Sequence, residues 1–322
     1  MRAVYAESIN PDDPLAGLVI GERPEPEAPA GWSKVAVKAA SLNHHDLWTL
    51  RGVGITADRL PMILGCDAAG IDTATGDEVV VHSVIATDGW TGDETLDPGR
   101  TLLSERHQGS IADFVVVPTR NLVPKPPALS FAEAACLPTA WLTAYRMLFV
   151  KAGLRPGQTV LVQGASGGVA TAAISLARAA GFRVWATART EVKQQAALTL
   201  GAHAAFASGA RLPDRVDVVL ETIGAATWSH SLKSLKPGGK VVVSGATTGS
   251  NPPADLSRVF FLQLQVIGST MGTRAELQDM ITFLGDTGLR PLIDRTIALT
   301  AAGEGLAAMA GGELIGKIVL EV

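Results

Sequence analysis

The sequence predicts an α/β protein that contains a doubly wound parallel sheet. Apolar segments and helix-like segments alternate from Gly157 onward, and this alternation is typical of a parallel sheet with helices on both faces. The chain before this point is rich in strand-like segments separated by turn residues. A length of 322 residues fits about two domains. We therefore expect a β-rich domain and a separate parallel-sheet domain.

The first part of the chain predicts three strands, at residues 34–40, 77–82 and 112–117. The first of these alternates polar and apolar side chains, as a half-buried strand does. The polar, glycine-containing stretch 86–108 shows no period, so we interpret it as a surface lobe or loop. Ser130 and Glu133 have the spacing of a capping box, which predicts a helix directly after Ser130.

The alternating part predicts five strands, at residues 159–163, 183–187, 217–221, 240–244 and 264–267. Helices are expected at 169–180 and 191–200, and each is followed by a glycine that can end it. The link 207–216 is short, so we expect the usual connecting helix to be missing there. A last helix near 275–284 precedes a strand at 317–320, which we expect to return to the first domain.

Composition and charge exclude several classes of protein. The chain is 47% hydrophobic and 18% charged, which excludes a disordered protein. A net charge of −4 gives no sign of a basic surface that would bind nucleic acid or an anionic membrane. Cys66 and Cys136 are the two cysteines, too few for a disulfide framework or a four-cysteine zinc lobe. With no signal peptide or membrane-length apolar run in the sequence, we expect a cytoplasmic protein.

A glycine-rich loop stands between the first strand and first helix of the alternating part. It reads Gly164-Ala165-Ser166-Gly167-Gly168-Val169-Ala170. Glycines at such a bend let the backbone turn tightly and approach a pyrophosphate, which the helix N-terminus then binds. Gly167 and Ala170 fit the second and third fingerprint positions, whereas Ala165 replaces the first glycine. The alternative is an ordinary glycine-rich turn.

The residues after the second strand of the alternating part indicate which dinucleotide the chain binds. An acidic residue there would hold the ribose hydroxyl of NAD, but the chain has Ala188, Arg189 and Thr190, with Lys193 one turn later. The two cations can bind a 2′-phosphate and Thr190 can donate to it, which favours NADP(H). The alternative is that Arg189 and Lys193 are solvated surface charges.

The chain resembles the medium-chain dehydrogenase/reductase superfamily, and most of all its zinc-free quinone oxidoreductase branch. The resemblance covers nearly the whole length and rests on segments 41–48, 64–70, 76–79, 142–145, 164–170, 235–239 and 316–320. It implies a GroES-like β-barrel catalytic domain formed by residues 1–124 and 272–322. It also implies a Rossmann NADP-binding domain at 125–271, with the active site in the cleft.

The same resemblance bears on metal binding. Zinc members of the family carry ligands at three places that here hold Asn43, Cys66 and Thr139. Asparagine and threonine are poor zinc ligands, and residues 86–108 contain no cysteine, so we expect no metal. The alternative is a site improvised from the side chains of His44, His45, Cys66 and Asp67.

Further candidate residues come from the resemblance. Asn43 and Thr143 are expected near the nicotinamide and substrate. His45 is a candidate acid and Trp48, which stands where a tyrosine is usual, a candidate stacking wall. The alternatives are a turn residue for Asn43, a helix hydroxyl bonded back to its own turn for Thr143, a structural histidine for His45 and core packing for Trp48. Lys317 is expected to reach the cofactor unless it is solvated. The remaining candidate cofactor contacts are His44, Gly164, Ser166, Gly168, Val169, Thr222, Gly245, Ala246, Thr247, Gly268 and Ser269.

Without a metal, hydrogen-bond donors must polarise the substrate carbonyl, and they do so more weakly than a Lewis acid. The sequence therefore predicts hydride transfer from NADPH to a quinone or an α,β-unsaturated carbonyl compound. The alternatives are a zinc-type alcohol dehydrogenase-like enzyme, a catalytically silent NADPH-binding sensor, and an enoyl reductase that serves a carrier-bound substrate. The family often pairs subunits through an edge strand, and residues 264–267 predict a homodimer of this kind.

Overall fold

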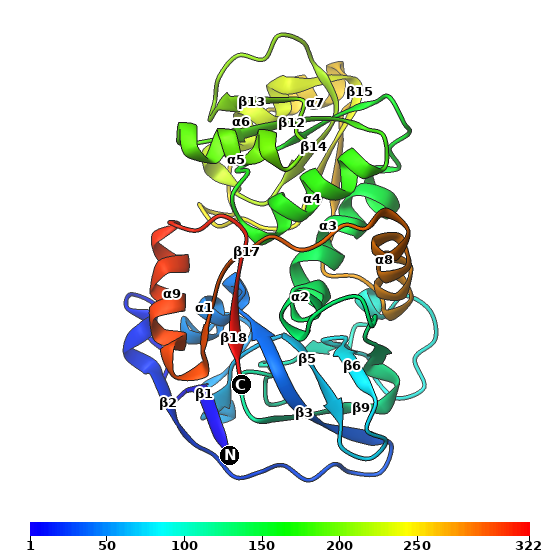
Figure 1. Ribbon diagram of the computed structural model, residues 1–322. Coiled ribbons are helices and arrows are strands. Elements are labelled where there is room, and N and C mark those ends of the chain that lie inside the picture. Colours follow the sequence, from blue (N-terminus) through cyan, green and yellow to red (C-terminus); the bar gives the residue numbers. More distant parts are fainter. The chain divides into compact units, whose positions relative to one another are not determined.

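The computed structural model describes residues 1–322 and divides them into two compact units. The first unit comprises Met1–Leu142 and Gly272–Val322, and the second comprises Thr143–Met271. In Figure 1 the first unit runs from blue to green and again from orange to red, and the second is green to yellow. Residues 125–142, which we assigned to the nucleotide domain, are grouped with the first unit. No helix in residues 1–322 has both the length and the apolar character needed to span a membrane.

The first unit is built mainly from strands. A seven-stranded sheet has the order β10-β6-β5-β3-β18-β17, with β9 paired to β3, and smaller sheets have the orders β2-β1-β4 and β7-β8. The strands are β1 (Arg2–Ala6), β2 (Leu18–Glu22), β3 (Trp32–Ser41), β4 (Met62–Ile63), β5 (Asp67–Asp72), β6 (Glu78–Val81), β7 (Val84–Ile85), β8 (Thr101–Leu102), β9 (Phe114–Pro118), β10 (Leu122–Pro124), β17 (Ile293–Ala298) and β18 (Lys317–Glu321).

Four α-helices accompany these strands: α1 (His44–Leu50), α2 (Phe131–Ala135), α8 (Arg274–Thr287) and α9 (Ala302–Gly311). Short 3₁₀ turns lie at Pro14–Gly17, Ala57–Arg59, Glu94–Leu96, Thr119–Asn121 and Leu299–Ala301, and a π-helical turn at Leu137–Trp141. The capping box predicted for α2 is confirmed, because Ser130 Oγ accepts from the Glu133 N–H and the Glu133 carboxylate accepts from the Ser130 N–H.

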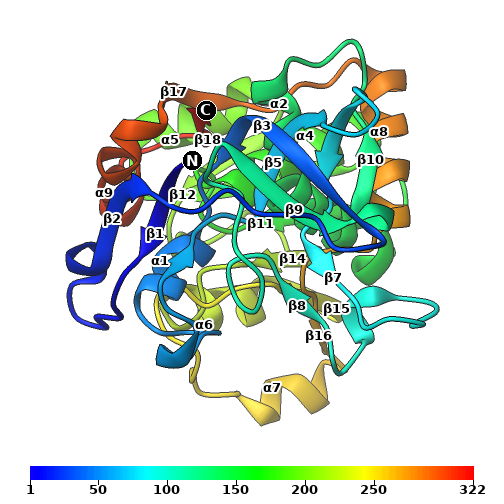
Figure 2. The same cartoon turned by 90° about the horizontal axis from the view of Figure 1, so that it is seen from below.

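The central strand β3 shows how alternating side chains build the core of this unit. Its side chains alternate between partly exposed and buried along Trp32–Val37, as the sequence predicted, and its buried members join a core with Leu64, Val81 and Leu320. The closing strand β18 pairs antiparallel with β3, with Val319 opposite Ser41, so the chain end returns to the first unit as expected. Figures 1 and 2 show β18 beside β3.

The stretch 86–108 differs from the surface lobe that we expected. It contains the short strand β8 and the turn Glu94–Leu96, and the side chains of Leu103 and Ser104 are fully buried. Leu103 belongs to the main hydrophobic core of the first unit. The expectation was wrong because the stretch is mostly polar, and the burial of its single core residue, Leu103, could not be recognised from composition.

The second unit is a doubly wound parallel sheet, as predicted. Its strands have the order β13-β12-β11-β14-β15-β16, and every neighbouring pair is parallel. They are β11 (Thr159–Val162), β12 (Arg183–Ala188), β13 (Ala204–Ala207), β14 (Val216–Glu221), β15 (Leu235–Val243) and β16 (Gln265–Gly268). The helices are α3 (Leu142–Tyr145), a π-helical segment Arg146–Ala152, α4 (Gly168–Ala179), α5 (Glu191–Thr199), α6 (Ala225–Ser234) and α7 (Leu256–Phe261).

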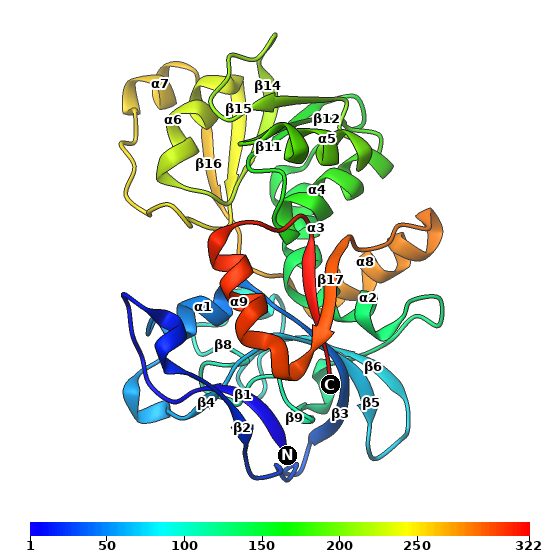
Figure 3. The ribbon, with the colours of Figure 1, turned by 60° about the vertical axis from the view of Figure 1, so that its left-hand side comes forward.

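The order of the strands reverses direction between β11 and β14. Right-handed crossovers then put α4 and α5 on one face of the sheet and α6 on the other, and Figures 1 and 3 show this arrangement. No helix joins β13 to β14, which confirms the expectation from the short link. The point of reversal is where ligands bind in open α/β sheets, beyond the carboxyl ends of the strands.

The chain leaves the first unit after Leu142 and re-enters it at Gly272. These two residues touch, because a Cβ atom on Gly272 would lie 2.6 Å from Leu142 Cδ1. The His82 ring also donates from Nε2 to the Gly272 carbonyl over 2.9 Å. The exit and re-entry points are therefore held side by side within the first unit.

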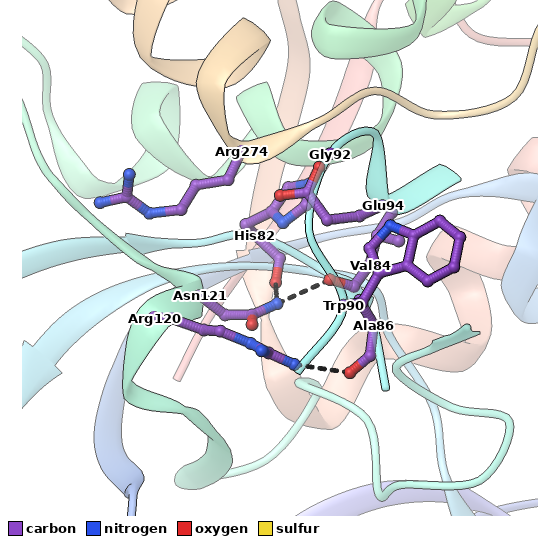
Figure 4. Close-up of a pocket in the computed structure, with 9 residues that line it drawn as sticks. All are labelled: His82, Val84, Ala86, Trp90, Gly92, Glu94, Arg120, Asn121 and Arg274. Carbon is purple, nitrogen blue, oxygen red and sulfur yellow. Dashed lines mark hydrogen bonds between the residues drawn. The ribbon is translucent and has the colours of Figure 1, made fainter. Parts of the chain in front are cut away.

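A small pocket of about 80 Å³ adjoins this place. Figure 4 shows Asn121 donating to the carbonyls of His82 and Val84, and Arg120 donating to the carbonyl of Ala86. Arg274 donates to the Leu122 carbonyl. These polar side chains bind backbone carbonyls of the first unit, and none of the candidate site residues lines this pocket. Its polar groups serve the fold.

Candidate active site

The second unit brings the predicted nucleotide contacts to one edge of its sheet. Because all six strands are parallel, the residues that follow them lie along the same carboxyl edge. These are Gly164, Ser166, Gly167, Gly168 and Val169 after β11, Ala188 at the end of β12 with Arg189, Thr190 and Lys193 after it, Thr222 after β14, Gly245, Ala246 and Thr247 after β15, and Gly268 and Ser269 at the end of β16.

The glycine-rich loop has the backbone geometry that a phosphate site needs. Gly164 has a φ of +69°, a left-handed conformation that favours glycine, and a Cβ atom there would lie 2.5 Å from Ile223 Cδ1. Gly167 is the N-cap of α4 and faces open space. The space beside Gly167 allows a ligand to approach the backbone closely.

The backbone N–H groups in the first turn of α4 lack the side-chain acceptor that four other helices have. The helices α2, α5, α7 and α8 each begin with a side chain that accepts from a first-turn N–H. In α4 no side chain caps the helix and its first turn holds no acidic residue. The N–H groups at this end, with the positive end of the helix dipole, fit the pyrophosphate of a dinucleotide.

Two cations lie beyond β12. Arg189 and Thr190 are exposed, and Thr190 Oγ1 accepts from the Lys193 N–H over 3.4 Å, which caps α5. Partial burial and the charge of Arg189 lower the pKa of Lys193. Two like charges held near each other repel, so a bound anion such as a 2′-phosphate would relieve the repulsion.

A buried polar network beneath this edge was missed by the sequence analysis. Thr187 Oγ1 donates to Gln163 Oε1 over 2.6 Å, and Gln163 Nε2 donates to Ser231 Oγ over 3.0 Å. Ser231 Oγ donates to Glu221 Oε2 over 2.6 Å. Glu221 Oε1 also accepts from the N–H groups of Ile223 and Gly224, which fixes the loop after β14. Polar residues at the ends of three apolar strands were the signal that pointed to it.

The first unit holds a buried cation, Lys317. Its side chain is 3% exposed, and Nζ donates to the Leu42 carbonyl over 2.7 Å and to Asn43 Oδ1 over 2.6 Å. Its third partner is Asp67 Oδ2, at 3.3 Å. All three ammonium protons are used inside the unit. The alternative of a solvated Lys317 is therefore wrong, and its expected contact with the cofactor stays a prediction.

Asn43 belongs to the same cluster. Its Nδ2 group donates to Asp67 Oδ2 over 2.8 Å and to the Ser41 carbonyl over 3.2 Å, and its Oδ1 accepts from Lys317. Both amide protons and the amide oxygen of Asn43 are therefore engaged within the first unit. Its expected catalytic and cofactor roles stay predictions.

Two carboxylates complete this cluster. Asp67 is fully buried, and its Oδ1 has no hydrogen-bond partner. Asp46 accepts from the Asn43 N–H over 2.8 Å and from the Gly65 N–H over 3.0 Å. Burial raises the pKa of Asp46 to about 6. The start of α1 is thus tied to the loop before β5.

His45 lies between two acceptors. Its Nδ1 is 3.3 Å from Cys66 Sγ and its Nε2 is 3.3 Å from Glu105 Oε1. Burial opposes a charged ring, but the neighbouring Cys66 and Glu105 outweigh burial and raise the pKa of His45 well above its usual value. His45 is 14% exposed. Glu105 was missed because it lies in the stretch interpreted as a surface loop.

The other predicted residues have less defined partners. His44 is exposed at the start of α1, and Trp48 is partly buried in the same helix. Thr143 is 4% exposed in α3 of the second unit. Their expected roles stay predictions.

The three positions that match zinc ligands do not form a fitting donor set. The Asn43 amide is engaged with Lys317, and the Cys66 thiol donates to the Leu103 carbonyl over 3.2 Å. Thr139 offers a buried hydroxyl without a partner. Zinc prefers deprotonated cysteine, histidine or carboxylate ligands, so these residues do not suit it.

Comparison with known families decides the identity of the two units. Residues 29–127 match the family of alcohol dehydrogenase GroES-like domains, and residues 168–286 match the zinc-binding dehydrogenase family. A solved structure of an NAD-dependent alcohol dehydrogenase is 33% identical, with a TM-score of 0.92 and 100% of both chains covered. This chain belongs to the medium-chain dehydrogenase/reductase superfamily. Its first unit is the GroES-like domain and its second is the Rossmann domain of this superfamily.

Other members of the superfamily with similar sequences include reductases of coenzyme A thioesters. The acryloyl-coenzyme A reductase of Metallosphaera sedula is 28% identical over 94% of this chain and 96% of its own length. The spectinabilin polyketide synthase protein NorB of Streptomyces orinoci is 32% identical over 94% of this chain. This chain spans 14% of the length of NorB. The structure of the crotonyl-CoA carboxylase/reductase AntE with NADP is 25% identical, with a TM-score of 0.91, and covers 100% of this chain and 94% of AntE.

Proposed function

We propose that this protein is an NADPH-dependent reductase of α,β-unsaturated carbonyl compounds, and that enoyl thioesters are the substrate class to test first. The observation that carries the proposal is the polar centre of the first unit. Lys317 engages Asn43 Oδ1 and Asp67 Oδ2, so these oxygen atoms are not free to bind a metal. The His45 ring lies between Cys66 and Glu105, and these neighbours raise its pKa despite its burial.

The donor set favours this substrate class for a chemical reason. A protonated imidazole polarises a carbonyl less strongly than a metal ion does. Conjugated acceptors need less polarisation, because the charge that develops on hydride addition spreads onto the carbonyl oxygen. The names of the acryloyl-coenzyme A reductase and the crotonyl-CoA carboxylase/reductase support thioesters of this kind.

The cofactor is NADP(H). The uncapped start of α4 suits its pyrophosphate, and Arg189 with Lys193 suits its 2′-phosphate. When bound, NADPH supplies the hydride. We propose that Thr143, Thr222, Gly245, Ala246, Thr247, Gly268 and Ser269 position the nicotinamide end, and that His44 also contacts the cofactor.

The first unit supplies the proton in this proposal. His45 donates a proton to the carbon next to the carbonyl, and solvent protonates the ring again. Trp48 provides a flat apolar wall for the substrate. Both residues lie on α1, so one short helix would carry the proton donor and the wall.

A screen of NADPH oxidation tests the proposal. Crotonyl-CoA and acryloyl-CoA are compared with quinones, simple aldehydes and alcohols, with NADH in parallel. We expect turnover with the enoyl thioesters and NADPH and none with simple alcohols. Turnover restricted to alcohols, with stoichiometric zinc in the protein, would favour the alcohol dehydrogenase alternative. NADPH binding without any turnover would favour a sensor, and turnover with quinones alone would move the substrate class to quinones.

We also propose that two copies of the chain pair through β16. This strand is the edge of the parallel sheet, and Val266 on it is 52% exposed. The neighbouring helix α7 exposes Leu256, Phe260 and Phe261 by 70% or more. An uncovered apolar edge of this kind is suited to pairing with a second copy.

A further inference from the structure

Glu221 is a fully buried carboxylate at the end of β14. Its Oε1 accepts from the N–H groups of Ile223 and Gly224 over 2.8 and 3.1 Å, and its Oε2 accepts from the Ser231 hydroxyl over 2.6 Å. The Thr227 hydroxyl lies 2.9 Å from both oxygens. Because a buried polar group costs free energy unless it is hydrogen-bonded, the carboxylate holds these donors in one arrangement.

The loop after β14 takes its shape from Glu221. Gly224 has a φ of +92°, and a Cβ atom there would lie 2.5 Å from the Gly249 carbonyl oxygen. The Ile223 carbonyl accepts from the N–H and from the hydroxyl of Thr248, each over 2.8 Å. Glu221 therefore fixes the loop after β14 and, through Ile223, the loop after β15.

Glu221 also reaches the glycine-rich loop through three side chains. Ser231 Oγ, which donates to Glu221, accepts from Gln163 Nε2 over 3.0 Å. Gln163 Oε1 accepts from the Thr187 hydroxyl over 2.6 Å, and Thr187 Oγ1 accepts from the Gly164 N–H over 3.4 Å. Gln163 directly precedes Gly164 in the chain, so the network holds the start of the glycine-rich loop.

The two loops also contact each other directly. A Cβ atom on Gly164 would lie 2.5 Å from Ile223 Cδ1, and the backbone of Ile223 is held by Glu221. A change at Glu221 thus reaches the glycine-rich loop by two routes, the packing of Ile223 and the hydrogen-bonded network. A fully satisfied buried network of this kind makes a structure rigid.

We propose that Glu221 is a positioning residue for NADP(H), which holds the glycine-rich loop and the loop after β14 in the shape that binds the dinucleotide. This inference rests on the proposed function, which assigns the start of α4 to the pyrophosphate and Thr222 to the nicotinamide end. Loops that are already ordered lose less conformational entropy when a ligand binds, so the ligand binds more tightly. Because Glu221 is fully buried, it acts through the two loops and not by contact with the cofactor.

The first test measures the Kd of NADPH and of NADH by fluorescence titration of the full-length protein. We expect Glu221→Gln to raise both Kd values by a similar factor, about tenfold, because the two loops face parts that both dinucleotides contain. The matched control is Asp217→Asn on the same strand, where the carboxylate accepts from the Thr159 N–H and pairs with Lys236. This control should keep both Kd values. Unchanged Kd values in a folded Glu221→Gln variant, or an equal rise in Asp217→Asn, would overturn the inference.

The second test measures amide hydrogen exchange of the second unit without cofactor or substrate. In Glu221→Gln we expect faster exchange in segments 163–166 and 222–225 and unchanged exchange in α5. A loss of stability alone would instead speed exchange throughout the second unit, α5 included. That uniform result, or loops that exchange as slowly as those of the wild type, would contradict a positioning role.

Thr187 provides a pair of variants that leaves the carboxylate intact and covers the case in which Glu221→Gln does not fold. Thr187→Val removes the hydroxyl with little change of shape, so both Kd values should rise about three- to tenfold. Thr187→Ser keeps the hydroxyl and should bind both dinucleotides as the wild type does. Equal Kd values of the two variants would overturn the proposal. A wild-type protein that binds NADPH but does not reduce crotonyl-CoA would refute the proposed function and leave the role of Glu221 standing, because neither test needs a substrate.

Discussion

The Lys317 ammonium donates to Asn43 Oδ1 over 2.6 Å, and the same nitrogen lies 3.3 Å from Asp67 Oδ2. Both partners are almost fully buried. A buried ion pair of this kind contributes little net stability, but removal of one partner leaves an uncompensated charge. The first unit therefore depends on all three residues being present together.

Lys317→Met tests this dependence. We expect the free energy of unfolding to fall by about 3–5 kcal/mol, because the Asp67 carboxylate loses its counter-charge. Urea denaturation followed by circular dichroism measures it. The double variant Lys317→Met/Asp67→Asn should recover part of the loss. Equal stability of Lys317→Met and the wild type would contradict the arrangement described.

Asp46 predicts a pH dependence of stability. Its pKa is raised to about 6 in the folded protein from 3.8, so the folded state binds the proton more tightly than the unfolded state does. Ionisation of Asp46 thus costs stability as the pH rises from about 4 to 6, by about 3 kcal/mol in total. In Asp46→Asn this part of the pH dependence should disappear. Parallel curves of unfolding free energy against pH for the two proteins would refute it.

Gly167→Asp separates folding from nucleotide binding. The residue faces open space and has an ordinary φ of −74°, so an aspartate fits and would cap α4, with only a few tenths of a kcal/mol effect on stability. Its charge would repel the pyrophosphate and weaken NADPH binding about tenfold or more. Fluorescence titration with NADPH and a thermal melt provide the two measurements. Gly167→Ala is the control, and unimpaired NADPH binding by the aspartate variant would disprove the phosphate site.

Arg189 and Lys193 predict the preference for NADPH. Alanine at both positions should raise KM for NADPH about tenfold or more, since charge-assisted hydrogen bonds contribute about 1.5–3 kcal/mol each, and leave KM for NADH nearly unchanged. Arg183→Ala, at the amino end of β12, is the matched control. Equal effects on the two cofactors would show that the cations do not bind the 2′-phosphate.

The edge strand β16 predicts the state of assembly. A charged residue at an exposed edge blocks pairing of strands, so Val266→Arg should convert a dimer into a monomer. Light scattering at micromolar concentration measures this. Val192→Arg, at a 71% exposed position on α5, is the control. A wild-type protein that is monomeric under these conditions would rule out the pairing.

Periodicity and turn chemistry predicted most of the second unit. Apolar strands and small-residue helices alternate there. Each buried strand shows as a run of apolar residues, so it can be recognised from its own sequence. In the first unit, the helix α9 and the strand β17 were not predicted, because α9 is rich in alanine and glycine and no residue of β17 is fully buried. Neither segment carries the strong periodicity that marks a buried face.

The polar centre of the first unit was predicted only in part. His45, Asn43 and Lys317 were all named as candidates, but the hydrogen bond between Asn43 and Lys317 was not predicted, because a sequence does not reveal that residues 274 positions apart are bonded. Glu105 was overlooked for the same reason, since it meets His45 across 60 residues. Residue types indicated the chemistry, while the pairing of donors and acceptors depended on the fold.

The contact of Leu142 with Gly272 makes the Rossmann unit a module inserted at a single point. Its two ends are close enough that a short glycine linker could replace residues 143–271 and leave the strands of the GroES-like unit connected. The same geometry would let the chain accept the nucleotide-binding module of a relative, and with it a different cofactor preference, without a change in the polar centre around His45.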